Sequence, residues 1–515
     1  MLSAKAGIHL FILPDVPPLA NEQRITKVTS GLVISIINMP SGLVIIMALP
    51  YTRFQDREVG MDTSVFSIRN PWRSGLLPKE PDRIPRHELQ TALSWMDSRH
   101  VITIVGPRQA GKSTLMNMLI RHLLSSTVPA ANIFYFTTDD AETVTLLANI
   151  GDLLAFIRGN STGNGRLYLF IDEIQRLESP GLFLKTLYDV DLDLKIVASG
   201  SSSLEIRSAS KEHLVGRGRE LVLYPLSFGD IAASRIPGLQ ASSADIAQIQ
   251  RLYGTDLLRT FEECAMWGTY AAVVTAPTMA QRHDELQQLY QSYVLRDVSQ
   301  FFHIQHVGVF NNLTTLLAGS VGSQVQWETL ARTTKSSAQT IHSYVDLLEG
   351  TFVCRQVLPY TGNVVGSIRR MPKIYFIDCG LRNSVLSDFS ALSSRSDRGH
   401  LVEQVVFQEL CKILEPTDRL YYWRMYAGSH EVDFVVVRGE SLVPIEIKDS
   451  GMRNPEVPDG IGDFSKAFKP RGAIVMNRDF AGEAMSRTTT VTFLPTATTL
   501  ARPDLFRELL TNALH

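Results

Sequence analysis

Short apolar runs alternate with stretches of helical periodicity over residues 99–235. The runs cover residues 101–105, 133–137, 166–171, 194–199 and 220–224. Strands that are buried on both faces of a parallel sheet have this near-continuous apolar character. After the first run, apolar residues from Leu115 to Leu123 recur at the spacing of one helix face. The pattern predicts an α/β fold with a three-layer core of five strands.

A glycine-rich loop follows the first run and fits the pattern G-x-x-x-x-G-K-[ST]. It comprises Gly106, Pro107, Arg108, Gln109, Ala110, Gly111, Lys112, Ser113 and Thr114. Backbone N–H groups of such a loop close around phosphate oxygens, and the following helix adds the positive end of its dipole. We therefore expect ATP here, with Lys112 at the β- and γ-phosphates and Ser113 coordinating Mg²⁺.

Polar residues end two further runs. Asp172 and Glu173 follow the run 166–171, as in a Walker B motif. Asp172 is expected to hold Mg²⁺ through water, and Glu173 to polarise the water that attacks the γ-phosphate. Ser201 is the first candidate for sensing that phosphate and Ser199 is the second.

Two arginines lie just before the last run. Arg217 or Arg219 is a candidate for the cation that stabilises the transition state, donated within the chain or by a neighbouring subunit of a homo-oligomer. The alternative is a solvated loop arginine without a catalytic role, and both interpretations stay open.

Four segments together carry a family resemblance. GPRQAGKST, LFIDEIQRL, VASGSSS and GRGRELVLYPLSF resemble a group of prokaryotic AAA-type ATPases, in which a P-loop core precedes an uncharacterised C-terminal domain. The resemblance covers roughly residues 80–460. It implies an ATP-dependent molecular switch or motor and leaves the cellular role open. Such proteins commonly begin close to the P-loop strand, so the long N-terminal extension departs from the pattern.

The middle of the chain is rich in helix-forming residues. Residues 236–305 are predicted to form a helical lid and connector. Residues 327–349 resemble a winged helix-turn-helix, with the first wing strand expected at residues 351–358. Its exposed face carries few basic residues, Lys335 and the nearby Arg332. This weakens the case for DNA binding, because attraction to phosphate dominates affinity for DNA. Contact with DNA and packing against protein both stay open.

Carboxylates and a lysine recur in the C-terminal portion. Glu403 lies in a segment of helical periodicity, and Asp433 lies in an apolar run. Glu446 and Lys448 are two residues apart in another run, so their side chains share one sheet face. The order resembles that of the PD-(D/E)-x-K nucleases, although Val432 replaces the usual proline.

That second resemblance implies a restriction-endonuclease-like α/β fold. In such nucleases two carboxylates hold a divalent metal and the lysine orients the attacking water, so a second Mg²⁺ or Mn²⁺ and a DNA substrate are implied. The alternatives are a degenerate domain that recognises a partner and a solvated ion pair between Glu446 and Lys448.

An apolar segment lies near the start of the chain. Residues 31–50 carry no charge and are about long enough to span a bilayer, but they include Pro40, Gly31 and Gly42. Residues 1–60 are therefore interpreted as an over-extended or disordered start, as a peripheral hydrophobic segment or, least favoured, as a membrane span.

The composition narrows the functional classes. Of the 515 residues, 44% are hydrophobic and 20% are charged, which excludes global disorder. A net charge of -2 excludes a uniformly basic nucleic-acid coat, yet permits one local basic surface. The four cysteines are scattered and form no C-x-x-C pair, so a disulfide scaffold or a structural zinc site is not expected. This cysteine usage favours a reducing cytoplasm.

These observations predict seven segments and one leading function. The segments are an extension (1–60), a lead-in helix region (61–98), the ATPase core (99–235), the lid and connector (236–305), a winged-helix-like domain (306–385), a nuclease-like domain (395–480) and a tail (481–515). The leading hypothesis is an ATPase that drives domain or oligomer rearrangement and acts on DNA or a protein partner. Its rivals are an ATP-regulated nuclease and a slowly hydrolysing, nucleotide-gated adaptor.

Overall fold

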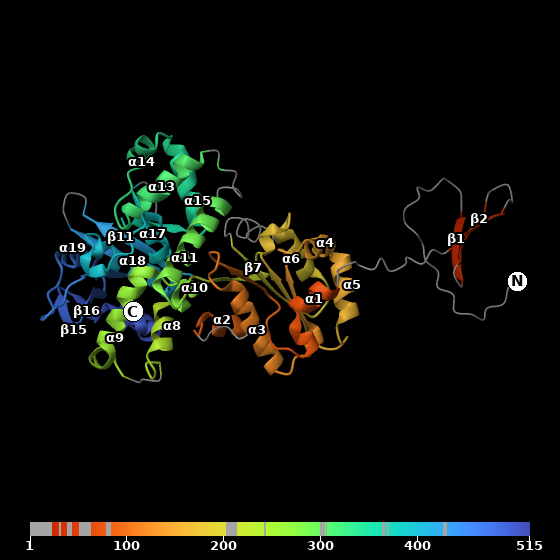
Figure 1. The fold of residues 1–515 in the computed structure, drawn as a ribbon, viewed down its shortest axis with the longest axis horizontal. Coiled ribbons are helices and arrows are strands. Elements are labelled where there is room, and N and C mark those ends of the chain that lie inside the picture. Colours follow the sequence, from red (N-terminus) through yellow and green to blue (C-terminus); the bar gives the residue numbers. More distant parts are fainter. Residues whose placement is uncertain are drawn as a thin grey trace.

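Two β-sheets and a helical region between them make up most of the chain in this computed structural model (Figure 1). The structure describes residues 23–29, 32–38, 44–50, 63–78, 84–201, 214–240, 244–298, 304, 306–362, 366–367, 370–425 and 430–514.

The first sheet contains five parallel strands in the order β5-β6-β7-β4-β8. Its strands are β4 (Val101–Val105), β5 (Ile133–Thr137), β6 (Leu167–Asp172), β7 (Leu194–Gly200) and β8 (Gly218–Val222). Because β4 and β7 are buried along their whole length, apolar residues occupy most of their positions. The sheet confirms the predicted α/β fold with a P-loop type of core.

Helices cover both faces of this sheet. Apolar side chains of α2 (Glu88–Ser94) and α3 (Lys112–Ser125) pack on one face. The other face is covered by α1 (Thr63–Arg69), α4 (Ala141–Leu147), α5 (Ile150–Asn160) and α6 (Pro180–Asp189). Short 3-10 turns lie at Pro71–Ser74, Ala130–Asn132 and Ile174–Arg176. This arrangement gives the three layers that the apolar runs predict.

Helices dominate the region from 228 to 386. They are α8 (Phe228–Arg235), α9 (Ile246–Trp267), α10 (Ala271–Thr275), α11 (Met279–Leu289), a π-helical segment (Tyr290–Val298), α13 (Val307–Gly319), α14 (Trp327–Thr334), α15 (Ala338–Gly350) and α17 (Cys379–Leu386). The turn between α14 and α15 begins with Lys335 in a left-handed conformation, and Ser337 caps α15. The two helices of the predicted helix-turn-helix are therefore present.

The second sheet has eight strands in the order β10-β9-β11-β12-β13-β14-β16-β15. They are β9 (Cys354–Pro359), β10 (Lys373–Phe376), β11 (Arg419–Arg424), β12 (Glu431–Arg438), β13 (Ser441–Ile447), β14 (Gly472–Asn477), β15 (Gly482–Ser486) and β16 (Thr489–Pro495). The strand expected at residues 351–358 is present, and its role as a wing stays a prediction. This strand is β9, which pairs with β11 and so belongs to this sheet.

The sheet therefore crosses the boundaries that we predicted at residues 385, 395 and 480. One face packs on α18 (Arg398–Ile413), α20 (Thr496–Ala501) and α21 (Pro503–Leu514), and the other packs on α19 (Asp459–Phe468). The short 3-10 turn Leu392–Ser394 precedes α18. Pairing between strands far apart in sequence, which no local pattern records, made these boundaries wrong.

The apolar segment near the start of the chain forms strands. Strands β1 (Gln23–Thr29), β2 (Leu32–Asn38) and β3 (Val44–Pro50) make an antiparallel three-stranded sheet. The two halves of the segment pair with each other, which contradicts a single spanning helix. Among the described residues, none of the helices is long and apolar enough to cross a bilayer. The predicted extension also includes residues 1–22 and 51–60, which lie outside the described residues.

Candidate functional site

The glycine-rich loop connects the end of β4 to the start of α3. A Cβ atom on Gly106 would lie 2.0 Å from the carbonyl oxygen of Leu223, so the backbones are too close for any other residue. Gly111 has a φ of 96° and directly precedes α3, a conformation that L side chains rarely adopt. These glycines bring the loop's backbone N–H groups to the N-terminus of α3, the arrangement that binds phosphate.

Lys112 is buried and bonds back onto this loop. Its ammonium donates to the carbonyl oxygens of Gly106 at 3.1 Å and Pro107 at 2.9 Å. Burial lowers the pKa of Lys112, against the opposing effect of Glu173 and Asp172. The ammonium therefore lies at the mouth of the phosphate-binding loop with two acids nearby.

Asp172 ends β6 and contacts three hydroxyl groups. Its Oδ2 accepts from Ser113 at 2.5 Å and from Tyr135 at 2.7 Å, and its Oδ1 accepts from Ser199. Ser113 and Asp172, the predicted Mg²⁺ residues, are thus brought into direct contact. Their hard oxygen donors fit Mg²⁺, which binds proteins through one or two carboxylates together with waters and phosphates. Ser199 supports Asp172 here.

Glu173 directly follows β6 in a left-handed conformation, with a φ of 56°. Its Oε2 accepts a hydrogen bond from Gln175 Nε2 at 2.5 Å and one from the Ser201 hydroxyl at 3.2 Å. Gln175 also donates to Ser201 at 2.9 Å, while its Oε1 is buried without a hydrogen-bond partner. The structure therefore brings Glu173 and Ser201 together and adds Gln175, which we did not predict. Its position two residues after Glu173 was the available signal.

Arg217 and Arg219 lie at the opposite edge of the sheet from the loop. The Arg217 carbonyl accepts from the N–H of Val101, which begins β4, whereas the loop follows the end of β4. Five strand residues separate the two places, about 16 Å at about 3.3 Å per residue. Arg217 pairs with Asp189 at 3.2 Å, and Arg219 lies over the ring of Trp95. Donation within the chain was therefore a wrong expectation, because both residues sit at the amino end of β8. Donation to a neighbouring subunit stays a prediction.

Arg86 braces the loop from outside the motif. Its guanidinium donates to the Ala110 carbonyl and, at 2.9 Å, to the Tyr224 carbonyl. Burial lowers the pKa of Arg86 from its ordinary value. Sequence reasoning missed this residue because it lies far upstream of the motif and belongs to no pattern of its own.

Asp433 and Glu446 lie side by side in the second sheet. Phe434 of β12 pairs with Ile445 of β13, and the two acids are the next residues along these strands. Both line a pocket of 590 Å³ with Lys448, whose ammonium lies 2.7 Å from Glu446 Oε1. Glu446 Oε2 is buried without a hydrogen-bond partner. Burial raises the pKa of both acids, and for Asp433 the charges of Glu403 and Glu446 add to the effect.

Glu403 is near these acids but is held by other groups. It accepts from Lys373 at 3.2 Å and from the Tyr375 hydroxyl, and His400 Nδ1 lies 3.6 Å away. Burial opposes its ionisation, yet Lys373, His400 and Tyr375 together hold its pKa below the ordinary glutamate value. Glu403 is therefore positioned as a partner of Lys373, and Asp433 and Glu446 are the two predicted acids that line the pocket.

Lys373 is the residue of this cluster that the sequence did not reveal. It is 2% exposed, begins β10 and also approaches Glu431 at 3.4 Å. Burial alone would lower its pKa, but Glu403, Asp433 and Glu431 raise it above the ordinary lysine value. The carboxylate cluster thus contains an internal cation.

Three family models match this chain. Residues 98–232 match an AAA domain, residues 258–392 match a Domain of unknown function (DUF8612), and residues 398–497 match a Domain of unknown function (DUF4143). The first match supports an ATP-binding protein of the AAA type, with a P-loop core.

Two relatives are described only as uncharacterised proteins. One from Haemophilus influenzae is 23% identical over 389 residues, 74% of this chain and 90% of its own length. One from Mycobacterium tuberculosis is 28% identical, covering 68% of this chain and 70% of its own. Among solved structures, the Aeropyrum pernix ORC1 protein in complex with DNA is 12% identical with a TM-score of 0.30, over 61% of this chain and 96% of its own.

Proposed function

We propose that this protein hydrolyses ATP with Mg²⁺ at the loop between β4 and α3. One observation carries the proposal. Lys112, Ser113, Asp172 and Glu173, which are predicted separately from two motifs, meet at the carboxyl edge of one parallel sheet. Ligands of open α/β sheets bind at that edge.

The residues divide the work of phosphoryl transfer. Backbone N–H groups of the loop and the N-terminus of α3 bind phosphate oxygens, and Lys112 turns from its loop carbonyls to the β- and γ-phosphates. Ser113 and Asp172 separate to hold Mg²⁺, which when bound neutralises charge on those phosphates. Nearly all of the catalytic effect in such transfers comes from positioning and charge.

Glu173 is proposed to polarise the attacking water. In the described arrangement its carboxylate is bonded to Gln175 and Ser201, and Gln175 keeps one buried acceptor, Oε1, unused. A water that donates one proton towards Glu173 and the other towards Gln175 Oε1 satisfies both groups. Gln175 is therefore a positioning residue, and Ser201 is placed to contact the γ-phosphate.

A buried ion pair connects the nucleotide-binding core to the C-terminal sheet. Lys412 of α18 donates to the Leu226 carbonyl at 2.9 Å, and Glu409 accepts the N–H of Phe228 at 3.0 Å. The two side chains also pair with each other at 2.7 Å. Since these backbone groups lie within six residues of the end of β8, a shift of the core on ATP turnover would be transmitted to α18. This supports ATP-driven rearrangement of the domains, with DNA or a protein as the partner acted on.

The test is phosphate release and ATP binding by the full chain with Mg²⁺. Lys112→Ala should lower hydrolysis by about 10²–10³-fold, as expected when one preorganised charge contact is lost. Lys466→Ala removes an exposed lysine from α19 and is the matched control. Unchanged turnover in Lys112→Ala would refute the assignment.

A second candidate function, a metal-dependent nuclease, is favoured by the pocket of Asp433, Glu446 and Lys448. The unused Glu446 Oε2 and the adjacent Asp433 provide hard oxygen ligands for Mg²⁺ or Mn²⁺. Such an ion, when bound, stabilises the attacking and leaving oxygens of a phosphodiester. Lys448 is proposed to orient water, and Glu403, bonded to Lys373 and Tyr375, is a positioning residue.

Cutting of double-stranded plasmid with Mn²⁺, with and without ATP, tests this second function. Asp433→Ala should abolish this cutting. Glu440→Gln, which removes an acid at the exposed turn between β12 and β13, is its matched control. Failure of the wild type to cut in any nucleotide state would leave the sheet as a recognition domain, the interpretation that fits a nucleotide-gated adaptor.

A further inference from the structure

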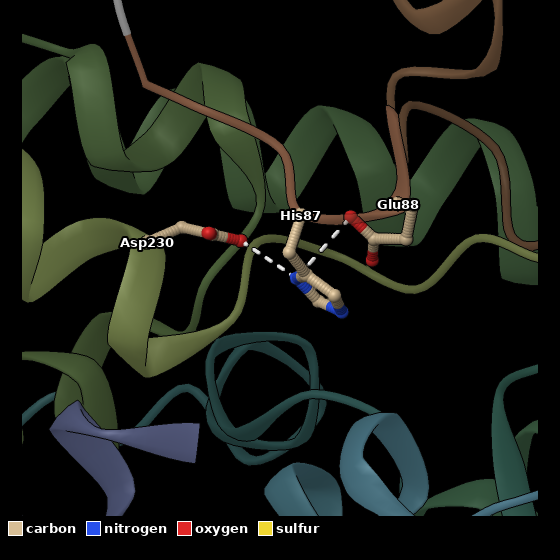
Figure 2. Close-up of side chains that lie close together, drawn as sticks. All are labelled: His87, Glu88 and Asp230. Atoms are coloured by element: carbon tan, nitrogen blue, oxygen red, sulfur yellow. Dashed lines mark hydrogen bonds and ion pairs between the residues drawn. The ribbon is translucent and has the colours of Figure 1, made fainter. Parts of the chain in front are cut away.

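A histidine and two carboxylates meet where the segment before α2 crosses α8 (Figure 2). His87 immediately precedes α2, Glu88 is its first residue, and Asp230 lies in the first turn of α8. His87 Nδ1 lies 3.3 Å from Asp230 Oδ2 and 3.5 Å from Glu88 Oε2. Figure 2 shows both carboxylates pointing toward the imidazole from opposite sides. None of these residues belongs to the ATP site or to the C-terminal pocket.

The two carboxylates are buried, and one of them keeps an oxygen without a hydrogen bond. Glu88 is 6% exposed and Asp230 is 5% exposed, and Glu88 Oε2 has no hydrogen-bond partner. Buried carboxylates are stable only when they are paired or coordinate a metal. The unsatisfied oxygen points at the histidine, so the cluster is built around the place where a cation would lie.

Neighbouring arginines do not serve as that cation. Arg86 approaches the other oxygen of Glu88 only to 3.9 Å, and its donors go to the carbonyls of Ala110 and Tyr224. The positive charge of Arg507 opposes protonation of His87, but its guanidinium donates to the Ile413 carbonyl and pairs with Glu415. Arg86 therefore pairs with Glu88 Oε1 only, and neither guanidinium group donates a hydrogen bond to Glu88 Oε2.

The spacing of the ligand atoms fits a small tetrahedral ion. Zinc bonds to histidine nitrogen and carboxylate oxygen are about 2.0–2.2 Å, which places neighbouring ligand atoms of a tetrahedron about 3.3–3.6 Å apart. The two separations from His87 Nδ1, 3.3 and 3.5 Å, fall in this range, and the two carboxylate oxygens lie within 4.8 Å of each other. An imidazole among the ligands favours zinc or a similar transition metal over Mg²⁺ and Ca²⁺, which prefer oxygen alone.

We propose that His87 Nδ1, Glu88 Oε2 and Asp230 Oδ2 bind one Zn²⁺ ion, or a transition-metal ion of similar size. The fourth position is open to water, because the His87 side chain is 37% exposed. The ion joins the segment before α2 to α8. Because Arg86 is the preceding residue and braces Ala110 of the phosphate-binding loop, the ion also holds that brace in place.

Metal analysis of the full chain tests this site without ATP. The protein is stripped with a chelator, dialysed against Zn²⁺ and measured by elemental mass spectrometry. We expect about one tightly held zinc per chain, together with a melting temperature raised by a few degrees. Glu88→Gln and His87→Ala should each lose both effects, and Glu88→Gln keeps the size of the side chain in case the alanine variant folds poorly.

Two control variants make the result specific. His122→Ala removes an exposed histidine at the end of α3, and Glu440→Gln removes an exposed acid between β12 and β13, so both should keep the zinc. A wild-type protein that neither retains zinc nor is stabilised by it would overturn the proposal. Retention of zinc by Glu88→Gln and His87→Ala would overturn it equally, and neither result depends on whether ATP is hydrolysed.

Discussion

The ATP site and the C-terminal pocket are both built from acids at strand ends, yet their acids are satisfied in different ways. Asp172 accepts hydrogen bonds from three hydroxyl groups. Because these donors are neutral, a metal ion displaces them at little electrostatic cost. At the second sheet, Glu403 of α18 is neutralised by the buried ammonium of Lys373, and Glu446 of β13 keeps one oxygen without a hydrogen bond. The first site is therefore prepared for a ligand, whereas part of the second is already occupied by the protein's own cation.

The contrast between the two sites requires that each site works without the other. Asp433→Ala should abolish any plasmid cutting and leave ATP hydrolysis without DNA near the wild-type rate, because the acid lies in a separate sheet. Lys448→Ala should also abolish cutting while retaining metal affinity, since lysine provides no ligand oxygen. Parallel assays of cutting, phosphate release and Mn²⁺ binding decide the matter, and loss of ATP hydrolysis in Asp433→Ala would contradict the separation.

Lys373 and Lys448 should differ sharply in their contribution to stability. Lys373→Met leaves buried carboxylates uncompensated and should lower the free energy of unfolding by about 3–5 kcal/mol. Lys448 is about half exposed, so loss of its pair with Glu446 should cost at most about 1 kcal/mol. Denaturant unfolding of Lys373→Met and Lys448→Met measures both. Equal costs would show that Lys373 is not an internal counter-ion.

Gln175 should have a smaller effect, confined to the chemical step. Gln175→Ala removes one acceptor for the attacking water but leaves Glu173 and Mg²⁺ binding intact. We expect a roughly tenfold lower kcat with little change in KM, the sign of an interaction made mainly in the transition state. A raised KM with unchanged kcat would instead indicate a role in binding nucleotide.

The smallest effect is expected at the start of the chain. A protein beginning at Met61 should remain soluble with unchanged ATP hydrolysis, since the nucleotide-binding residues all lie beyond that point. Size-exclusion chromatography and phosphate release compare it with the full chain. Aggregation or loss of activity would show that β1, β2 and β3 support the fold.

The ATP site was largely predictable because its chemistry is local in sequence. Strand, loop and helix follow one another around Lys112, and the acids at the end of β6 reach the same edge because the sheet is parallel. The same rule shows why Arg217 was misplaced. It precedes its strand, so it lies at the amino edge, away from the phosphates.

The second sheet shows where sequence patterns lose information. Glu446 and Lys448 share a face because they are two residues apart, which the sequence records directly. Lys373 reaches Glu403 only through the pairing of β10 with β9 and the packing of α18, neither of which leaves a local pattern. Arg86 and His87 are similarly defined by partners more than twenty residues away.

The most direct test of the proposed ATP hydrolysis is a single-turnover measurement on Glu173→Gln. The amide preserves the size of the side chain but cannot accept a proton from water, so ATP should bind with near wild-type affinity. Hydrolysis should fall by about 10²–10⁴-fold. Wild-type rates of ATP cleavage in Glu173→Gln, or loss of ATP binding in place of cleavage, would contradict the assignment of Glu173 and of the site built around it.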